Sequence, residues 1–150
     1  MSWRLTVAAV IERDGRYLLV EEVDEATGTR VFNQPAGHVE PGESVLDAAV
    51  REVREETGLA FTPTAFLGLY QLRAADGRDY LRVAFAGTVP PEERPRPEDP
   101  DILGCAWVEG GELPGLSLRS PLVRRCLEDY EAGRRLPLEA AATFIQAPGR

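Results

Sequence analysis

The sequence predicts an α/β fold in which helices cover a mixed β-sheet. Several short apolar segments rich in β-branched residues are separated by turn residues, a pattern typical of strands. Two other segments combine helical spacing of apolar residues with residues that cap helices. With 150 residues, the chain has the length of one domain and can bury a hydrophobic core. Strands mixed with two helices predict layers of helix, sheet and helix.

The first elements form a predicted hairpin. Residues 3–11 are mostly apolar or β-branched, and residues 17–20 are a second apolar run. The intervening residues 13–16 read Arg-Asp-Gly-Arg, which is typical of a tight turn. A short extended segment at 31–34 is stopped by a proline, and residues 37–42 are predicted to form a loop.

A central helix is predicted over residues 44–57. Ser44 is a favourable N-cap residue, and Asp47 three residues later fits the pattern of a capping box. Gly58 follows the last helical residue and supplies the usual C-terminal stop.

Beyond this helix, residues 64–72 and 79–88 predict two strands around a turn at 75–78. Residues 89–101 form an acidic loop whose prolines exclude the interior of a strand or helix. A last strand is predicted at 104–108.

The C-terminal part begins with a second predicted helix. Ser120 and Pro121 are residue types favoured at the N-cap and the first helical position, and Gly133 ends the helix. We expect residues 1–150 to form a single domain, with a loosely packed tail from about residue 138.

Composition limits the partners of the chain. Asp and Glu number 25 and Lys and Arg number 17, so the net charge is −8. An acidic chain repels phosphate backbones, so no nucleic acid polymer is expected as a partner. We see no signal peptide, and no apolar run approaches the roughly 18 residues of a spanning helix. We therefore expect a cytoplasmic protein without membrane contact.

Three glutamates crowd one flank of the central helix. At about 100° per residue, Glu56 falls inside the apolar stripe formed within residues 45–53. Glu52 lies about 20° beyond the edge of this stripe, and Glu55 about 80° beyond it. Like charges at this spacing repel, and a carboxylate near the core loses hydration. Some other interaction must offset both costs.

Three explanations are open at this point. The carboxylates are solvated, they pair with basic residues such as Arg51 and Arg54, or they bind a divalent cation. Hard oxygen ligands at this spacing suit Mg²⁺ or Mn²⁺, which keep several waters and bind phosphate oxygens.

The wider motif favours the cation. Residues 37–59 read GHVEPGESVLDAAVREVREETGL. This segment resembles the Nudix box, and the residues that match it are Gly37, Glu43, Arg51, Glu52, Val53, Glu55, Glu56, Gly58 and Leu59. With ordinary composition, a chance match is rarer than about one in a million.

The resemblance to Nudix hydrolases covers nearly the whole chain and implies an α/β/α sandwich around a mixed sheet. It implies hydrolysis of phosphoanhydride bonds by attack of water on phosphorus, assisted by Mg²⁺ or Mn²⁺. Glu43 and Arg51 would pair and orient the loop on the helix. The implied metal ligands are the side chains of Glu52, Glu55 and Glu56 and the carbonyl of Ala36.

The general base is open at this point. Glu52 is one candidate, and acids of the 89–101 loop are others, namely Glu98, Asp99 and Asp101.

Three residues outside the acidic flank are candidates for substrate contacts. Gln34 precedes the motif and can bond either the substrate or the backbone. His38 is the only histidine and lies in the segment that enters the motif. Arg119 stands at the start of the second helix, where an anion site and ordinary capping are both open.

A narrower similarity, to the NudJ phosphatase subgroup, is carried by residues 32–40, 101–108, 118–123 and 133–139. It implies release of terminal phosphate from nucleoside tri- and diphosphates and from thiamine or hydroxymethylpyrimidine pyrophosphate. The alternatives are a pyrophosphatase acting on ADP-ribose, a nucleotide sugar or a dinucleotide, and a non-catalytic nucleotide-binding module. The expected partner is a small-molecule phosphoanhydride, and the expected assembly is a monomer or a homodimer.

Overall fold

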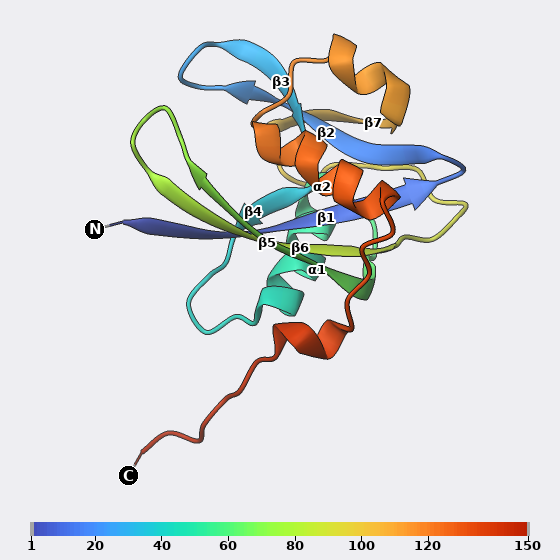
Figure 1. Ribbon diagram of the computed structural model, residues 1–150. Coiled ribbons are helices and arrows are strands. Elements are labelled where there is room, and N and C mark those ends of the chain that lie inside the picture. The colour runs from blue at the N-terminus through green and yellow to red at the C-terminus, as the bar shows by residue number, and fades with distance from the viewer. Residues whose placement is uncertain (1, 150) are drawn as a thin grey trace.

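The computed structural model describes residues 2–149, within which a seven-stranded sheet lies between two α-helices (Figure 1). The helices are α1 (Val45–Thr57) and α2 (Pro121–Glu131), with short 3-10 helices η1 (Gly110–Gly115) and η2 (Leu138–Ala141). The strands are β1 (Trp3–Arg13), β2 (Arg16–Asp24), β3 (Thr29–Asn33), β4 (Ala36–His38), β5 (Thr62–Arg73), β6 (Asp79–Thr88) and β7 (Ile102–Glu109). The predicted α/β class is confirmed.

Strand β1 lies at the centre of the sheet. The order is β3-β2-β1-β6-β5, while β4 pairs with β1 and β7 pairs with β2. β1 and β6 run parallel and the other pairs run antiparallel, so the sheet is mixed as predicted. The predicted β1–β2 hairpin forms, and Asp14 and Gly15 turn the chain with φ values of 52° and 79°.

Side chains of β1 point alternately to the two faces of the sheet, and the core is correspondingly divided into two clusters. Val7, Ala9 and Ile11 pack in the cluster beside α1, and Val10 packs in the cluster beside α2. Successive side chains of a strand point to opposite faces, so each helix covers one face of the sheet. The buried apolar residues that the helices contribute are Ala48, Ala49 and Val53 from α1 and Leu122, Val123, Cys126 and Leu127 from α2.

Strand β4 is the main departure from the sequence prediction. The predicted loop at 37–42 is wrong for its first two residues, because Gly37 pairs with Val7 and His38 pairs with Thr6. A three-residue strand that contains a glycine has too few residues to show the alternation from which strands are predicted. This strand carries the Nudix-like motif into the sheet immediately before α1.

The acidic loop of residues 89–101 is anchored to the end of α1. The backbone N–H of Arg96 bonds the carbonyl of Thr57 at 2.6 Å, and the N–H groups of Glu98 and Asp99 bond the carbonyl of Glu55 at 2.9 and 2.8 Å. A Cβ at Gly58 would overlap the carbonyl oxygen of Arg96. Gly58 therefore has two roles: its φ of 73° ends the helix, and its small size admits the loop.

The C-terminal segment remains in contact with the sheet further than the sequence predicts. Leu136 exchanges backbone hydrogen bonds with Phe66, and Leu138 and Ala141 pack against the cluster beside α1. Residues 142–149 are exposed, and Phe144 retains 91% of its accessible surface. Among the described residues, no helix has the length and apolar character needed to cross a membrane.

Candidate active site

Helix α1, which carries the acidic flank, is capped at both ends. The hydroxyl of Ser44 accepts the N–H of Asp47 at 3.0 Å, as the predicted cap requires. At the other end, the N–H of Gly58 bonds the carbonyl of Arg54 at 2.7 Å. Both ends of the helix are thereby fixed, so the glutamates between them have a defined orientation.

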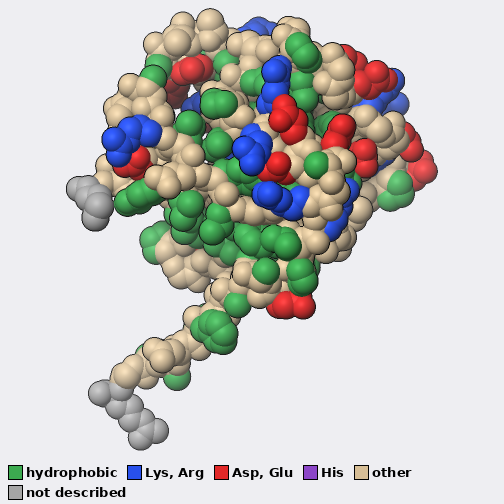
Figure 2. Space-filling view, viewed as in Figure 1, with side chains coloured by type: hydrophobic (Ala, Val, Ile, Leu, Met, Phe, Trp, Pro, Cys, Tyr) green, Lys and Arg blue, Asp and Glu red, His purple; other side chains and the backbone are tan. Residues whose placement is uncertain are grey.

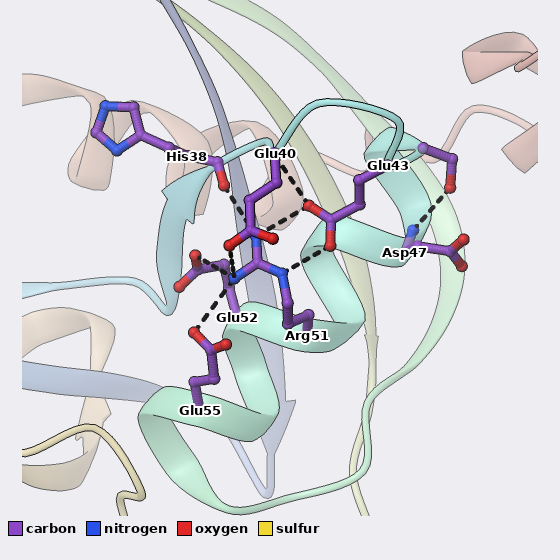
Figure 3. Close-up of polar contacts among 8 residues, drawn as sticks. His38, Glu40, Glu43, Asp47, Arg51, Glu52 and Glu55 are labelled. Carbon is purple, nitrogen blue, oxygen red and sulfur yellow. Dashed lines mark hydrogen bonds and ion pairs between the residues drawn. The ribbon is translucent and has the colours of Figure 1, made fainter.

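Arg51 is the centre of an ion-pair network along this flank (Figure 3). Its Nε and Nη2 donate to the two oxygens of Glu43 at 2.6 and 2.9 Å, and Nη2 also donates to the carbonyl of His38 at 2.9 Å. Its Nη1 donates to Glu52 at 2.9 Å and to Glu55 at 3.2 Å. The Arg51 guanidinium lowers the pKa of Glu43. The predicted pairing of Glu43 with Arg51 therefore exists, and it ties the loop before α1 to the helix.

Glu56 lies inside the apolar stripe, as the helical periodicity indicates. Only 6% of its surface is exposed, and its Oε1 accepts the backbone N–H of Ala36 at 2.8 Å. Burial raises the pKa of Glu56 to about 9, and the nearby charges of Glu52, Glu22 and Asp99 act in the same direction. A charged Glu56 is costly in this position unless a cation approaches it.

Glu52 is held against the backbone of β4. A Cβ at Gly37 would overlap the carboxyl group of Glu52, so a larger residue here would force this carboxyl group to move. Burial raises the pKa of Glu52, whereas the Arg51 guanidinium lowers it. Glu55 lies further out, with 43% of its side chain exposed.

The donor set fits a hard divalent cation in its chemistry. Three carboxylates lie on one flank of α1, and one of them, Glu56, is buried without an ion pair to any basic residue that the structure describes. Within residues 2–149, however, no three acidic, histidine or cysteine side chains already converge as a ligand cluster. Arg51 instead bonds both Glu52 and Glu55. Cation binding would require these two carboxylates to turn away from Arg51.

The structure places the three candidate substrate contacts in different surroundings. Gln34 has no exposed surface, and its Oε1 accepts Nη1 of Arg82 at 2.7 Å. His38 points away from the acidic flank (Figure 3), and burial and the Arg4 guanidinium lower its pKa. Arg119 bonds Glu22 at 3.2 Å and lines a depression of about 440 Å³ at the start of α2.

Sequence reasoning missed Arg82. This arginine lies in β6 with 7% of its surface exposed, although the strand around it is almost entirely apolar. A single charged residue at an inward position of an apolar strand was the available signal.

The NUDIX domain profile matches residues 2–128 of the chain. The chain belongs to the Nudix family and is a Nudix hydrolase, as the residues of α1 and β4 indicate. Nudix hydrolases generally use divalent metal ions.

Individual relatives narrow this assignment. The chain is 40% identical to phosphatase NudJ of Escherichia coli strain K12 over 141 residues, which cover 93% of this chain and 91% of that protein. A NUDIX hydrolase from Nitrosomonas europaea superimposes with a TM-score of 0.88 and 44% identity, covering 95% of this chain and 98% of the other. A MutT NUDIX hydrolase from Burkholderia pseudomallei gives a TM-score of 0.73 and 28% identity, covering 86% and 98%. The predicted resemblance to NudJ is confirmed.

Proposed function

We propose that this Nudix hydrolase releases terminal phosphate from nucleoside tri- and diphosphates and from thiamine or hydroxymethylpyrimidine pyrophosphate. The observation that carries the proposal is the 40% identity to phosphatase NudJ across 93% of the chain. An identity of this extent covers the strands and loops around α1 as well as α1 itself. The expected cofactor is Mg²⁺, with Mn²⁺ as the alternative.

The proposed ligands are the carboxylates of Glu52, Glu55 and Glu56 and the carbonyl of Ala36. When bound, the cation neutralises phosphate oxygens and lowers the pKa of a water. The chain itself fixes the geometry: the N–H of Ala36 holds one oxygen of Glu56, and Gly37 lets Glu52 lie against β4. Arg51 holds Glu43 and the His38 carbonyl, which keeps β4 and α1 in register.

A carboxylate of this site accepts the proton of the attacking water. Glu52 remains the first candidate because it is half-buried on the acidic flank. Of the loop acids, Asp99 is favoured, since its backbone N–H is bonded to the carbonyl of Glu55 and its charge raises the pKa of Glu52 and Glu56. Glu98 and Asp101 are both exposed. Replacing Glu52 and Asp99 separately by Asn or Gln and comparing kcat would identify the base.

A product assay with Mg²⁺ tests the proposed substrates. The protein is incubated with thiamine pyrophosphate, ADP, ATP and ADP-ribose, and the products are separated. Orthophosphate with thiamine monophosphate and stepwise dephosphorylation of ATP supports the proposal. Cleavage confined to ADP-ribose, a nucleotide sugar or a dinucleotide would instead define a pyrophosphatase. Tight nucleotide binding without any product would define a non-catalytic module. Cytoplasmic location and a monomeric or homodimeric state stay predictions.

A further inference from the structure

Two arginines that are withdrawn from solvent have no carboxylate partner in the part of the chain that the structure describes. Arg82 is buried, its Nη1 donates to the neutral amide of Gln34, its guanidinium also contacts the thiol of Cys126 in α2, and its Nε is buried without a partner. Arg4 is half-buried, and its Nε is likewise buried and unbonded. Buried guanidinium groups are normally paired, because removal of a charge from water is costly.

Both arginines lie on one face of the sheet together with His38. In the register of β4, β1 and β6, His38 is opposite Thr6, and Thr6 is opposite Arg82. Arg4 precedes Thr6 by two residues in β1 and therefore shares this face. It lies close enough to His38 for its charge to lower the pKa of the imidazole. Three adjacent strands thus contribute the side chains of Arg4, His38 and Arg82, which we call the cationic row.

The cationic row adjoins the proposed cation site through β4. The Cα of Gly37 lies against the carboxyl group of Glu52, whereas the next residue, His38, points away from the acidic flank (Figure 3). The N–H of Ala36, in the same strand, bonds Glu56. Only one or two residues of β4 therefore separate the acidic flank from the cationic row. A molecule bound at the acidic flank can extend past β4 and reach the opposite face of the sheet.

Helix α2 covers Arg82, whose guanidinium contacts the thiol of Cys126, but it leaves the start of β1, which carries Arg4, uncovered (Figure 1). Helix α2 crosses the middle of the face, while the start of β1 extends beyond it toward the β5–β6 hairpin (Figure 1). The surface in this view is hollowed between that hairpin and the β2–β3 hairpin (Figure 2). An anionic ligand can approach the start of β1 from this side.

The acids near Arg82 are already bonded elsewhere. The charges of Glu22 and Glu56 reach Arg82, but Glu22 accepts Nη1 of Arg119 at 3.2 Å and Nδ2 of Asn33 at 3.5 Å. Glu56 accepts the N–H of Ala36. The Nε atoms of Arg4 and Arg82 thus have no acceptor in the described part of the chain, which leaves the charge of both guanidinium groups without a carboxylate in contact.

We propose that the cationic row is an anion-binding subsite that holds the inner phosphate of the substrate, the one that the organic product retains. This inference rests on the proposed phosphatase function. Guanidinium groups match phosphate oxygens in geometry and charge, so they suit this ligand better than a neutral ring. The acidic flank with its cation would bind the departing phosphate, and Arg4, supported by the charge of Arg82, would bind the phosphate that stays. Arg4 contacts the ligand directly, while Arg82, which lies in the interior beside Gln34 and Cys126, contributes its charge from behind.

The decisive test measures binding of the product without metal. Protein in EDTA is titrated calorimetrically with thiamine monophosphate and with AMP, and each is compared with its phosphate-free parent, thiamine or adenosine. We expect at least one monophosphate to bind more tightly than its parent, and Arg4→Gln to weaken that binding about tenfold, as for loss of one charge-assisted hydrogen bond. Binding of the parent compound should not change.

A matched control and a second variant complete the experiment. Arg78→Gln removes an exposed arginine of the β5–β6 turn that pairs with the exposed Asp76, and it should bind the monophosphate as the wild type does. Arg82→Gln should also weaken binding where thermal melting shows that it folds; where it does not fold, Arg4→Gln decides alone. Equal affinity of Arg4→Gln and wild type, or no preference for either monophosphate over its parent, would overturn the inference.

The outcome is separable from that of the proposed function. With Mg²⁺ present, loss of the subsite should raise KM for thiamine pyrophosphate or ADP more than it lowers kcat, because the inner phosphate is bound in ground and transition state alike. Orthophosphate release with an unchanged KM in Arg4→Gln would refute the subsite and leave the phosphatase standing. Products other than orthophosphate from the wild type would refute the phosphatase, whatever the monophosphate titration shows.

Discussion

Replacement of Gly37 by alanine is expected to slow catalysis strongly while leaving the fold intact. The added Cβ would overlap the carboxyl carbon and both carboxyl oxygens of Glu52. The backbone at this strand position is not in the left-handed region, so alanine itself is tolerated there. The substitution therefore acts on the position of one carboxylate rather than on the conformation of the chain.

The size of the effect follows from ordinary contact distances. Non-bonded carbon atoms are in contact at about 3.5–4.0 Å, so the carboxyl group of Glu52 must move by about 1 Å or more. A displacement of this size at a reacting centre costs about a hundredfold in turnover. The expected change in unfolding free energy is smaller, about 1 kcal/mol or less, because no buried atom is removed and no buried charge is created.

The assay compares Gly37→Ala with Gly104→Ala. A Cβ at Gly104, in β7, would meet nothing within 4 Å, so this variant controls for the same chemical change in a strand without the overlap. Initial rates of orthophosphate release are measured with Mg²⁺, and thermal melting shows whether each variant folds. If Gly37→Ala folds and turns over as fast as Gly104→Ala, the position of the Glu52 carboxylate does not matter for catalysis.

Further predictions concern the charged residues of the site, one surface ion pair and the metal. Glu56→Gln keeps an acceptor for the Ala36 N–H but removes the ionisable group. Burial raises the pKa of Glu56 from 4.5 to about 9. The metal-free wild type should therefore lose stability as the pH rises through this interval, whereas the variant should not. Melting in EDTA at about pH 5 and about pH 8 measures this, and equal pH slopes would contradict it. Arg51→Lys loses the two-pronged contact with Glu43 and should cost about 2 kcal/mol in urea unfolding together with most of the turnover; an unaffected midpoint would show that the network is not stabilising. Arg16→Gln breaks a pair with Glu109 whose side chains are 56% and 59% exposed, and its unfolding midpoint should stay within about 0.5 kcal/mol of the wild type. Excess EDTA should abolish product formation and added Mg²⁺ should restore it, whereas persistent turnover in EDTA would exclude the proposed metal dependence.

The acidic flank could be predicted because helical periodicity is a local property. The sequence places Glu56 inside the apolar stripe of α1, and the structure buries it to 6% exposure. The caps at Ser44 and Gly58 are likewise set by neighbours within a few residues. The pairing of Glu43 with Arg51 followed from the family motif and lies eight positions apart, within reach of one helix and its preceding loop.

Contacts between distant segments could not be predicted in the same way. Arg82 bonds Gln34 across 48 positions, and Arg119 bonds Glu22 across 97. Strand order decides both contacts, and the sequence gives no local signal for strand order. The same limit hid β4, since only pairing with β1 makes three residues around a glycine into a strand.

The opposite faces of β4 explain how a chain with a net charge of −8 can attract a polyanion. On one side of the strand, Glu52 and Glu56 form an acidic flank that repels phosphate until a cation neutralises it. On the other side, Arg4 and Arg82 carry positive charge that needs no metal. A substrate with two linked phosphates would satisfy both sides only when it spans the strand, with the bond to be cleaved near β4. A molecule with a single phosphate would satisfy one side alone, so the same division of charge would favour release of the shortened product after hydrolysis.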